Sequence, residues 1–261
     1  MLRRPTWCAA LAALALSLMG PIGSARAETV TVFGDDNYPP VSQLEQGRPR
    51  GLLPALLHEV GRRTGDEFVV RLFPWRRAYE QAQNGEGGIM GISFNQQRAQ
   101  IFDYSEALYD DDIQIVVLKG RGFKFDSLES LKGMTIGGVL GASYGDRVDA
   151  AIKNGLFVVD RDVSQVARMR KLLAGRLDAA FVGNGKIGID YLLGGDATLR
   201  ARRDDIEVLS PPLERDPLHL AFAKPMGKAA LIQRFNAAVA AMRQSGELET
   251  ILRANAGAAT N

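Results

Sequence analysis

Residues 68–92 read FVVRLFPWRRAYEQAQNGEGGIMGI and carry the strongest signal for the fold. The apolar run at 68–73 is typical of a strand, Pro74 stands where proline favours the start of a helix, and residues 88–92 form another short apolar run. A strand pattern at 29–34 and a helical pattern over 53–60 precede this stretch. The order strand, helix, strand, helix, strand predicts a parallel sheet.

A second unit of the same kind follows residue 120. Strand and helix patterns alternate in it at residues 134–140, 146–153, 157–160, 166–173 and 177–182. An extended link precedes it, so we expect an α/β protein of two lobes, each a mainly parallel sheet flanked by helices. Ligands bind such sheets beyond the carboxyl ends of the strands. The candidate binding loops therefore begin at Asp35, Phe73, Ser93, Gly141 and Gly183.

The first 27 residues have the pattern of a secretory signal peptide. Leu2-Arg3-Arg4 is a basic start, residues 8–19 are an almost unbroken apolar run, and Ala25-Arg26-Ala27 fits an A-x-A cleavage site. The apolar run is shorter than the roughly 20 residues that a membrane span needs. We expect cleavage after Ala27 and a mature protein in the periplasm.

The composition argues against several classes of function. Of 261 residues, 46% are hydrophobic and 24% charged, as in an ordinary globular protein. Without Arg3, Arg4 and Arg26 the mature chain has 29 basic against 30 acidic residues, so nothing favours nucleic acid or an anionic membrane as a partner. Cys8 is the only cysteine and lies in the leader, which leaves no disulfide or thiolate chemistry. We expect neither a cofactor nor a metal.

Several loop motifs resemble one known family in their order and spacing. They are Gly91-Ile-Ser93-Phe-Asn-Gln-Gln-Arg98 followed by Phe102-Asp-Tyr-Ser105, Leu128-Glu-Ser-Leu-Lys-Gly133, Gly141-Ala-Ser143-Tyr144-Gly145, Ala174-Gly-Arg-Leu-Asp-Ala-Ala180 and Gln244-Ser-Gly-Glu-Leu248. Together they span essentially the whole mature chain. It resembles the extracytoplasmic solute-binding proteins of amino-acid ABC transporters, solute-binding family 3, with the type II periplasmic binding fold. The segment at 74–78, PWRRA, is similar to a P-W-x-R-A signature of a divergent branch.

The resemblance implies a ligand site around Arg98. This residue matches the arginine that binds the α-carboxylate of the ligand, Ser93 matches a serine that adds a hydrogen bond, and Gly91 belongs to the same motif. A guanidinium is permanently charged and offers two parallel N–H donors to a carboxylate, which fits that role. The alternative is a structural ion pair between Arg98 and Asp103.

Other residues are implied as site residues by the same resemblance. Tyr38 and Trp75 match aromatic walls of the family's site, with ordinary packing as the alternative, and Arg77 shares the signature of Trp75, with a surface salt bridge as the alternative. Ser143 and Tyr144 would reach the ligand from the second lobe, at a helix N-terminus whose free N–H groups attract an anion. The alternative there is a capping serine and a surface tyrosine.

The chain departs from the amino-acid binders in two acidic positions. Asn184 stands where they carry a ligand-binding aspartate, and an amide can accept a hydrogen bond but cannot neutralise an ammonium. The aspartate after the family's Gly-Phe is also absent, because Gly51-Leu-Leu stands there. Asp35 or Asp36 can supply the missing charge from the other lobe. We expect a small carboxylate-bearing ligand, an amino acid or an amino-acid-like molecule.

Other motifs suggest different chemistry, each with an argument against it. The segment at 183–188 fits a dinucleotide loop but lacks the acidic residue that closes the next strand. Ser143 in G-x-S-x-G, with His219 downstream, has the chain order of a hydrolase triad, but His219 falls inside a predicted strand. A calcium site at 110–112 is disfavoured because neighbouring strand residues point to opposite faces, so we expect a solvated entry to the hinge. His58 is expected to be a packed or surface histidine.

These expectations define a domain organisation. We expect a signal peptide at 1–27, a first segment of lobe 1 at 28–111, lobe 2 at 112–212, and a return segment of lobe 1 at 213–261. The last helices should pack on lobe 1 through Leu231, Phe235, Val239 and Met242. Two crossings between the lobes make a hinge, so a ligand that touches both lobes stabilises the closed state.

By resemblance, the closed form delivers its ligand to an inner-membrane ABC permease. The protein is then a monomer, and no catalytic step is needed. Two alternatives use the same fold: a periplasmic enzyme resembling the cyclohexadienyl dehydratases, with Asp35 or Asp36 as acid or base, and a ligand-sensing input protein that acts through a separate partner.

Overall fold

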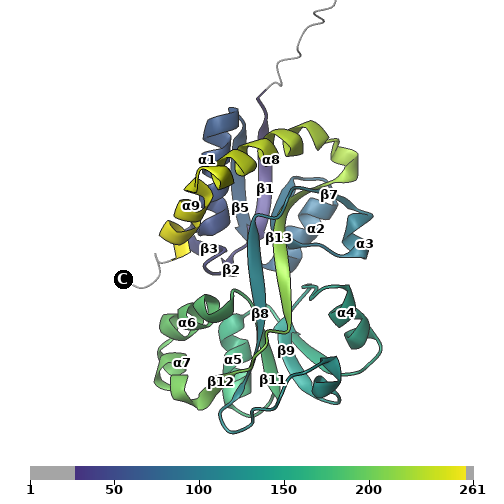
Figure 1. Cartoon of the computed structure of the whole chain (residues 1–261), viewed down its shortest axis with the longest axis vertical. Helices are drawn as coiled ribbons and strands as arrows, with labels where there is room; N and C mark the ends of the chain where they lie inside the picture. The colour runs from purple at the N-terminus through teal and green to yellow at the C-terminus, as the bar shows by residue number, and fades with distance from the viewer. Residues whose placement is uncertain (1–26, 257–261) are drawn as a thin grey trace, which may run out of the picture.

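The computed structural model describes residues 27–256 and shows two α/β lobes joined by two long strands (Figure 1). The predicted signal peptide lies outside the described residues except for Ala27. Within residues 27–256, no helix combines the length and the apolar character that crossing a membrane requires.

The joining strands are β8 (Tyr109–Leu118) and β13 (Glu214–Ala223). Residues 109–113 of β8 pair antiparallel with residues 214–218 of β13, and this ladder forms the hinge. Beyond it, β8 continues into lobe 2 and β13 continues into lobe 1, so the two predicted sheets are joined into one. The strand order is β10-β9-β11-β8-β13-β6-β1-β5. The predicted boundary at 111/112 stays a prediction, because β8 crosses it without a break.

Lobe 1 contains the chain up to β8 and the chain after β13. Its strands are β1 (Thr29–Asp35), β5 (Glu67–Phe73), β6 (Gly88–Ser93) and β7 (Phe102–Tyr104), with a small separate sheet of β2 (Asn37–Tyr38), β3 (Ser42–Glu45) and β4 (Arg48–Arg50). Its helices are α1 (Leu52–Thr64), α2 (Trp75–Gln83), α3 (Gln96–Ala99), α8 (Ala229–Gln244), α9 (Glu247–Ala256) and the short η3 (Lys224–Met226). Gly65, in the left-handed conformation, follows the end of α1, and α2 begins after Pro74 as predicted.

Lobe 2 is the segment between the hinge strands. Its strands are β9 (Thr135–Val139), β10 (Val158–Asp162), β11 (Ala179–Val182) and β12 (Ile206–Val208). Its helices are α4 (Asp146–Lys153), α5 (Gln165–Leu173), α6 (Gly185–Gly195), α7 (Ala197–Ala201), η1 (Leu128–Leu131) and η2 (Arg203–Asp205). The parallel pairs β9–β10 and β9–β11 confirm the second α/β unit.

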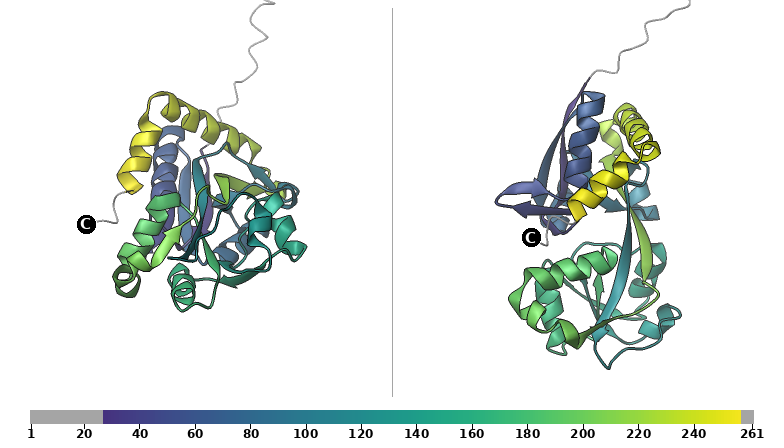
Figure 2. Two further views of the ribbon diagram at one scale, coloured as in Figure 1. Left: turned by 60° about the horizontal axis from the view of Figure 1, so that its bottom comes forward. Right: turned by 60° about the vertical axis from the view of Figure 1, so that its left-hand side comes forward.

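Each lobe has its own hydrophobic core. The largest cluster lies in lobe 1 between the sheet and the layer formed by α1, α8 and α9, which lie across that lobe in Figures 1 and 2. Leu231, Phe235, Val239 and Met242 of α8 are each fully buried in this cluster. The predicted apolar face of the last long helix therefore packs in the core of lobe 1.

Phe235→Ala should reduce the free energy of unfolding by about 3–5 kcal/mol, the range for removing a buried aromatic side chain. The reason is that Phe235 is 0% exposed and its ring packs edge-on against that of Phe68, with the two ring centres 5.8 Å apart. Urea denaturation followed by circular dichroism measures the change. Gln233→Ala, at an exposed position of the same helix, is the control. A loss for Phe235→Ala as small as the control's would show that α8 does not depend on this core.

Candidate ligand-binding site

A cavity lies between the lobes beside the hinge ladder. From lobe 1 it is lined by six of the predicted site residues, Asp35, Tyr38, Trp75, Gly91, Ser93 and Arg98, and from lobe 2 by Ser143 and Tyr144. Its lining also includes Asp111, Gln165, Arg168 and Asp216, which were not predicted as site residues. The predicted residues Arg77 and Asn184 are not among the lining residues.

Arg98 is held at the cavity wall by the short helix α3. The side chain of Asn95 caps this helix and accepts a hydrogen bond from the Arg98 backbone N–H at 2.7 Å. The guanidinium donates to the Ser93 carbonyl at 3.1 Å and lies 5.2 Å from the ring centre of Tyr79 and 5.8 Å from that of Trp75. Asp103 is paired with Lys224 at 3.0 Å instead, so the alternative ion pair with Arg98 is not formed.

Gly91 and Ser93 lie at an irregular point of β6. The register to β13 shifts there, so that Met90 pairs with Leu220 and Ile92 with His219, and Gly91 is the extra residue of the bulge. Its φ of 74° is in the region that favours glycine. Ser93 follows the bulge. Its hydroxyl donates to Asp216, and its backbone carbonyl accepts from Arg98.

Trp75 and Tyr38 line the cavity through different contacts, whereas Arg77 lies outside it. Trp75 opens α2, lines the cavity and donates from Nε1 to the Gly141 carbonyl of lobe 2 at 3.3 Å. The hydroxyl of Tyr38 donates to the Asp111 carboxylate. Arg77 is exposed, and its guanidinium lies 4.2 Å from the ring centre of Phe73. The structure thus places Arg77 outside the cavity, and its position gives no support for a ligand contact.

The turn that carries Ser143 and Tyr144 differs from the prediction. Free N–H groups were expected there, but the Tyr144 N–H donates to Asp149 at 3.0 Å and the Gly145 N–H to the Ser143 hydroxyl at 3.3 Å. Side chains of the turn and of α4 thus occupy these two donors, and an anion contact at this helix start stays a prediction. Tyr144 is 5% exposed rather than a surface residue.

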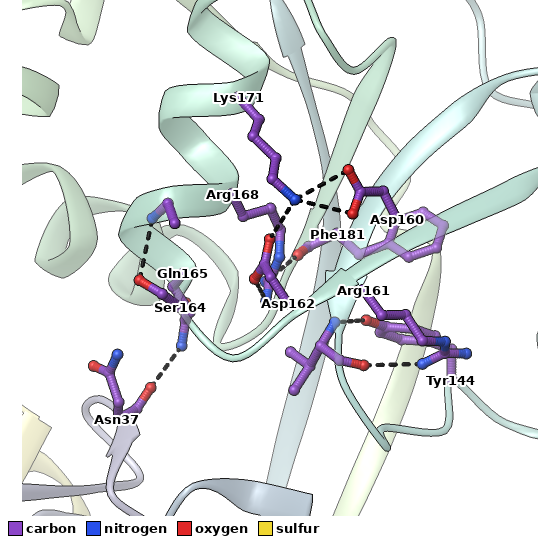
Figure 3. Close-up of polar contacts among 12 residues, drawn as sticks. Asn37, Tyr144, Asp160, Arg161, Asp162, Ser164, Gln165, Arg168, Lys171 and Phe181 are labelled. Carbon is purple, nitrogen blue, oxygen red and sulfur yellow. Dashed lines mark hydrogen bonds and ion pairs between the residues drawn. The ribbon is translucent and has the colours of Figure 1, made fainter.

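Two arginines support the lobe 2 wall (Figure 3). Arg161 donates to the carbonyls of Val139 and Ala142, both at 2.9 Å, and so fixes the turn before Ser143. Arg168 is 1% exposed and donates to the Phe181 carbonyl at 3.1 Å and to Asp162 at 3.2 Å. Because Asp162 pairs with it, the Arg168 charge is balanced within lobe 2.

Asp111 lies where both lobes meet the hinge. It accepts hydrogen bonds from the Tyr38 hydroxyl of lobe 1 and from the Asn184 backbone N–H of lobe 2. Asn184 also donates from Nδ2 to the Pro39 carbonyl at 3.2 Å. Asp111 is 2% exposed, so the prediction of a solvated acidic entry is wrong for this residue. Strand alternation explains the error, since the side chain of Asp111 points inward between the more exposed Asp110 and Asp112.

Burial changes the pKa values of the cavity's carboxyl groups. It raises the pKa of Asp35 to about 6 and that of Asp111 to about 6. It raises the pKa of Asp216 to about 7, with the neighbouring Asp111 acting in the same direction and Arg98 opposing it. Asp36 does not line the cavity, so of the two acids predicted to replace the lost charge only Asp35 is in place.

The competing motifs are not assembled into the sites that they suggested. Ser143 bonds to Asn95 at 2.9 Å and to Asp149, whereas His219 lies in β13 with its Nδ1 2.9 Å from the Ser105 carbonyl. After the glycine-rich turn at 183–188, the next strand is β12, which pairs antiparallel with β8 and so does not complete a parallel dinucleotide-binding unit. Among the described residues, no group of three or more His, Cys, Asp or Glu is placed to hold a metal ion.

The lobes also touch each other directly around the cavity. Gln165 donates to the Asn37 carbonyl at 3.0 Å (Figure 3), Asn95 to Ser143, and the Gln96 N–H to Asp146 at 3.1 Å. A Cβ atom on Gly183 would clash with the Tyr38 hydroxyl and the Asp111 carboxylate. The structure is thus the closed arrangement of the lobes, and glycine at 183 permits it.

Two lobes, two hinge strands and a cavity with charged side chains between the lobes define a binding protein with the type II periplasmic fold. Residues 30–257 match the sequence profile of the bacterial extracellular solute-binding proteins, family 3. The chain belongs to this family.

Named relatives are amino-acid binders. The "Probable histidine-binding protein" of Neisseria gonorrhoeae is 25% identical over 253 residues, which cover 93% of this chain and 91% of that protein. The L-cystine-binding protein TcyJ of Escherichia coli K12 is 24% identical over 226 residues, covering 85% and 80%. The crystal structure of an ancestral arginine-binding protein bound to arginine superposes with a TM-score of 0.70 at 21% identity, covering 87% of this chain and 97% of that one.

The Asp216 carboxyl should make the unliganded protein less stable as the pH rises. Below its ordinary pKa of 3.8 the group is protonated in both states, but between 3.8 and about 7 only the unfolded state has lost the proton. The free energy of unfolding therefore falls through this window and stays low above it. Asp216→Asn removes this contribution, so its stability relative to wild type should rise from about pH 5 to about pH 8.

Urea titrations at the two pH values measure this difference. The control is Asp112→Asn, which removes the same charge from a half-exposed side chain of the other hinge strand. Equal pH dependence of the two variants would contradict a buried, proton-retaining Asp216.

Proposed function

We propose that this chain is an exported solute-binding protein that captures a small carboxylate-bearing ligand between its lobes and delivers it to an inner-membrane ABC permease. The single observation that carries the proposal is Arg98. Its side chain is 5% exposed and lines the cavity, and it makes no ion pair with any residue in the described range 27–256.

A buried charge without a counter-ion is costly, so this guanidinium favours an anionic ligand. The Arg98 side chain donates to the carbonyl groups of Ser93 at 3.1 Å and of Gly141 at the long distance of 3.5 Å. A guanidinium has five N–H donors, which leaves donors for a carboxylate. Tyr79 and Trp75 lie beside it and restrict its orientation, which reduces the entropy lost when a ligand binds.

The two lobes supply the transport step of the proposal. A ligand held by Arg98 of lobe 1 and by the lobe 2 wall stabilises the closed arrangement through its contacts with both. The closed form is then the state that a permease recognises. The sequence of the leader supports export to the periplasm, and the names of the relatives support an amino acid or a similar molecule as the ligand.

The ligand class can be tested with matched pairs on residues 28–261. A thermal-shift panel should contain L-histidine, L-arginine and L-cystine together with histamine, agmatine and cystamine, which lack only the carboxylates. A ligand at 100 times its Kd stabilises by about 2.7 kcal/mol and moves the Tm by several degrees. Shifts should occur with carboxylates and not with their decarboxylated partners. Shifts with the amines alone would overturn the proposal.

Arg98→Ala should weaken binding of the amino acid that gives a shift by about 10- to 150-fold, because a hydrogen bond to a charged group contributes about 1.5–3 kcal/mol. Isothermal titration calorimetry measures the change. Arg98→Lys keeps the charge but loses the paired donors and should recover only part of the affinity. Arg77→Ala is the control, since it removes an exposed arginine outside the cavity.

The same samples separate binding from catalysis. Mass spectrometry after long incubation should recover the ligand unchanged. Wild-type affinity in Arg98→Ala would contradict the proposed site, and steady conversion of the ligand would favour an enzyme on this fold.

A further inference from the structure

We propose that Asp216, with Asp111 opposite it in the hinge ladder, binds the positively charged amino group of the ligand. The pair then replaces the carboxylate that is missing at Asn184. This inference rests on the proposed function, because it takes the ligand's carboxylate to be held by Arg98.

The hinge register brings the two carboxylates together. Asp216 and Asp111 are direct partners in the antiparallel pairing of β13 with β8, and both line the cavity. Side chains at such opposite positions have Cβ atoms about 4.5–5.5 Å apart, and like charges there are destabilising. Asp216 is 8% exposed and Asp111 is 2% exposed. A cation in the cavity beside them would relieve this repulsion.

The protein itself supplies only neutral partners to this pair. Asp216 accepts from the Ser93 hydroxyl through Oδ2, and Asp111 accepts from the Tyr38 hydroxyl and the Asn184 N–H. Neither carboxylate forms an ion pair with a lysine, arginine or histidine of residues 27–256. Buried carboxyl groups in proteins either pair with a cation or keep their proton, so a cation from outside the chain is the partner that would stabilise the ionised form of this pair.

Asn184 gives an independent indication that a donor is missing. It is 4% exposed, and its Oδ1 atom has no hydrogen-bond partner in the described part of the chain. The backbone N–H of the same residue donates to Asp111, so this unpartnered acceptor belongs to a residue in contact with the carboxylate pair. Asn184 does not itself line the cavity, so its unpartnered oxygen describes the surroundings of the carboxylate pair and not a ligand contact.

Ser93 connects the cationic and anionic parts of the cavity. Its hydroxyl donates to Asp216, while its carbonyl accepts from the Arg98 guanidinium at 3.1 Å. An α-amino acid has its carboxylate and ammonium on one carbon atom. A single ligand can therefore pair its carboxylate with Arg98 and its ammonium with Asp216. Asp35 is the other acid in the cavity, and the experiment separates it from Asp216.

The experiment compares amino acids with analogues that keep the carboxylate and lack the amino group. The pairs are L-histidine and imidazolepropionate, L-arginine and 5-guanidinopentanoate, and L-cystine and 3,3′-dithiodipropionate. Calorimetry on residues 28–261 should show at least one amino acid binding about 30-fold or more tightly than its analogue, since losing the partner of a buried charge costs about 2 kcal/mol or more.

Asp216→Asn should reduce this ratio to about threefold or less, because an amide keeps the shape and the acceptor for Ser93 but not the charge. Binding of the analogue should be retained, which also shows that the variant is folded. The matched control Asp112→Asn removes a charge from the neighbouring register pair and should keep the wild-type ratio.

Two results would overturn the inference and leave the proposed function intact. One is equal binding of amino acid and analogue to the wild type, and the other is a ratio that survives in Asp216→Asn but is lost in Asp35→Asn. If none of the six compounds binds, both proposals fail together.

Discussion

The pairing of β8 with β13 is the constraint on which the rest of the molecule depends. One of these strands continues into each lobe, and the register between the two strands decides which side chains face the cavity. Asp111 and Ile113 of one strand, and Asp216 and Leu218 of the other, line it because alternate residues of a strand share a face. A slip of one residue in either strand would turn the two lining side chains of that strand outward. The hinge therefore fixes the cavity's shape and its charges at once.

Where the sequence was informative, the signal was local. Gly65 ends a helix and Pro74 precedes one because single residues dictate those boundaries. The loop motif that the resemblance identified contains Arg98, which lines the cavity. Asp111 and Asp216 were missed because their meeting depends on a register between strands about a hundred residues apart. A signal for Asp111 was present in the sequence, since it is the charged residue on an otherwise apolar face of β8. The signal for Asp216 was weaker, because Glu214 lies on the same face of β13.

A resemblance to a family predicts where a residue lies more reliably than it predicts which groups that residue contacts. Asn184 occupies the family's acidic position, yet its contacts here are with Asp111 and the Pro39 carbonyl. Likewise, in the turn at Ser143 the N–H groups of Tyr144 and Gly145 donate to side chains of the turn and of α4. In both cases neighbouring residues decide which polar groups remain available, and no single motif contains that information.

The energetics of closure combine two opposing contributions. Direct contacts such as Gln165 with Asn37 and Trp75 with Gly141 favour the closed arrangement. Enclosing Arg98 and the facing carboxylates disfavours it, because each charge loses water without gaining a counter-ion. Converting a mostly open population into a mostly closed one takes about 5.5 kcal/mol of differential binding. Under the proposed function, a ligand that neutralises these charges contributes to that difference, and closure then reports that the site is filled.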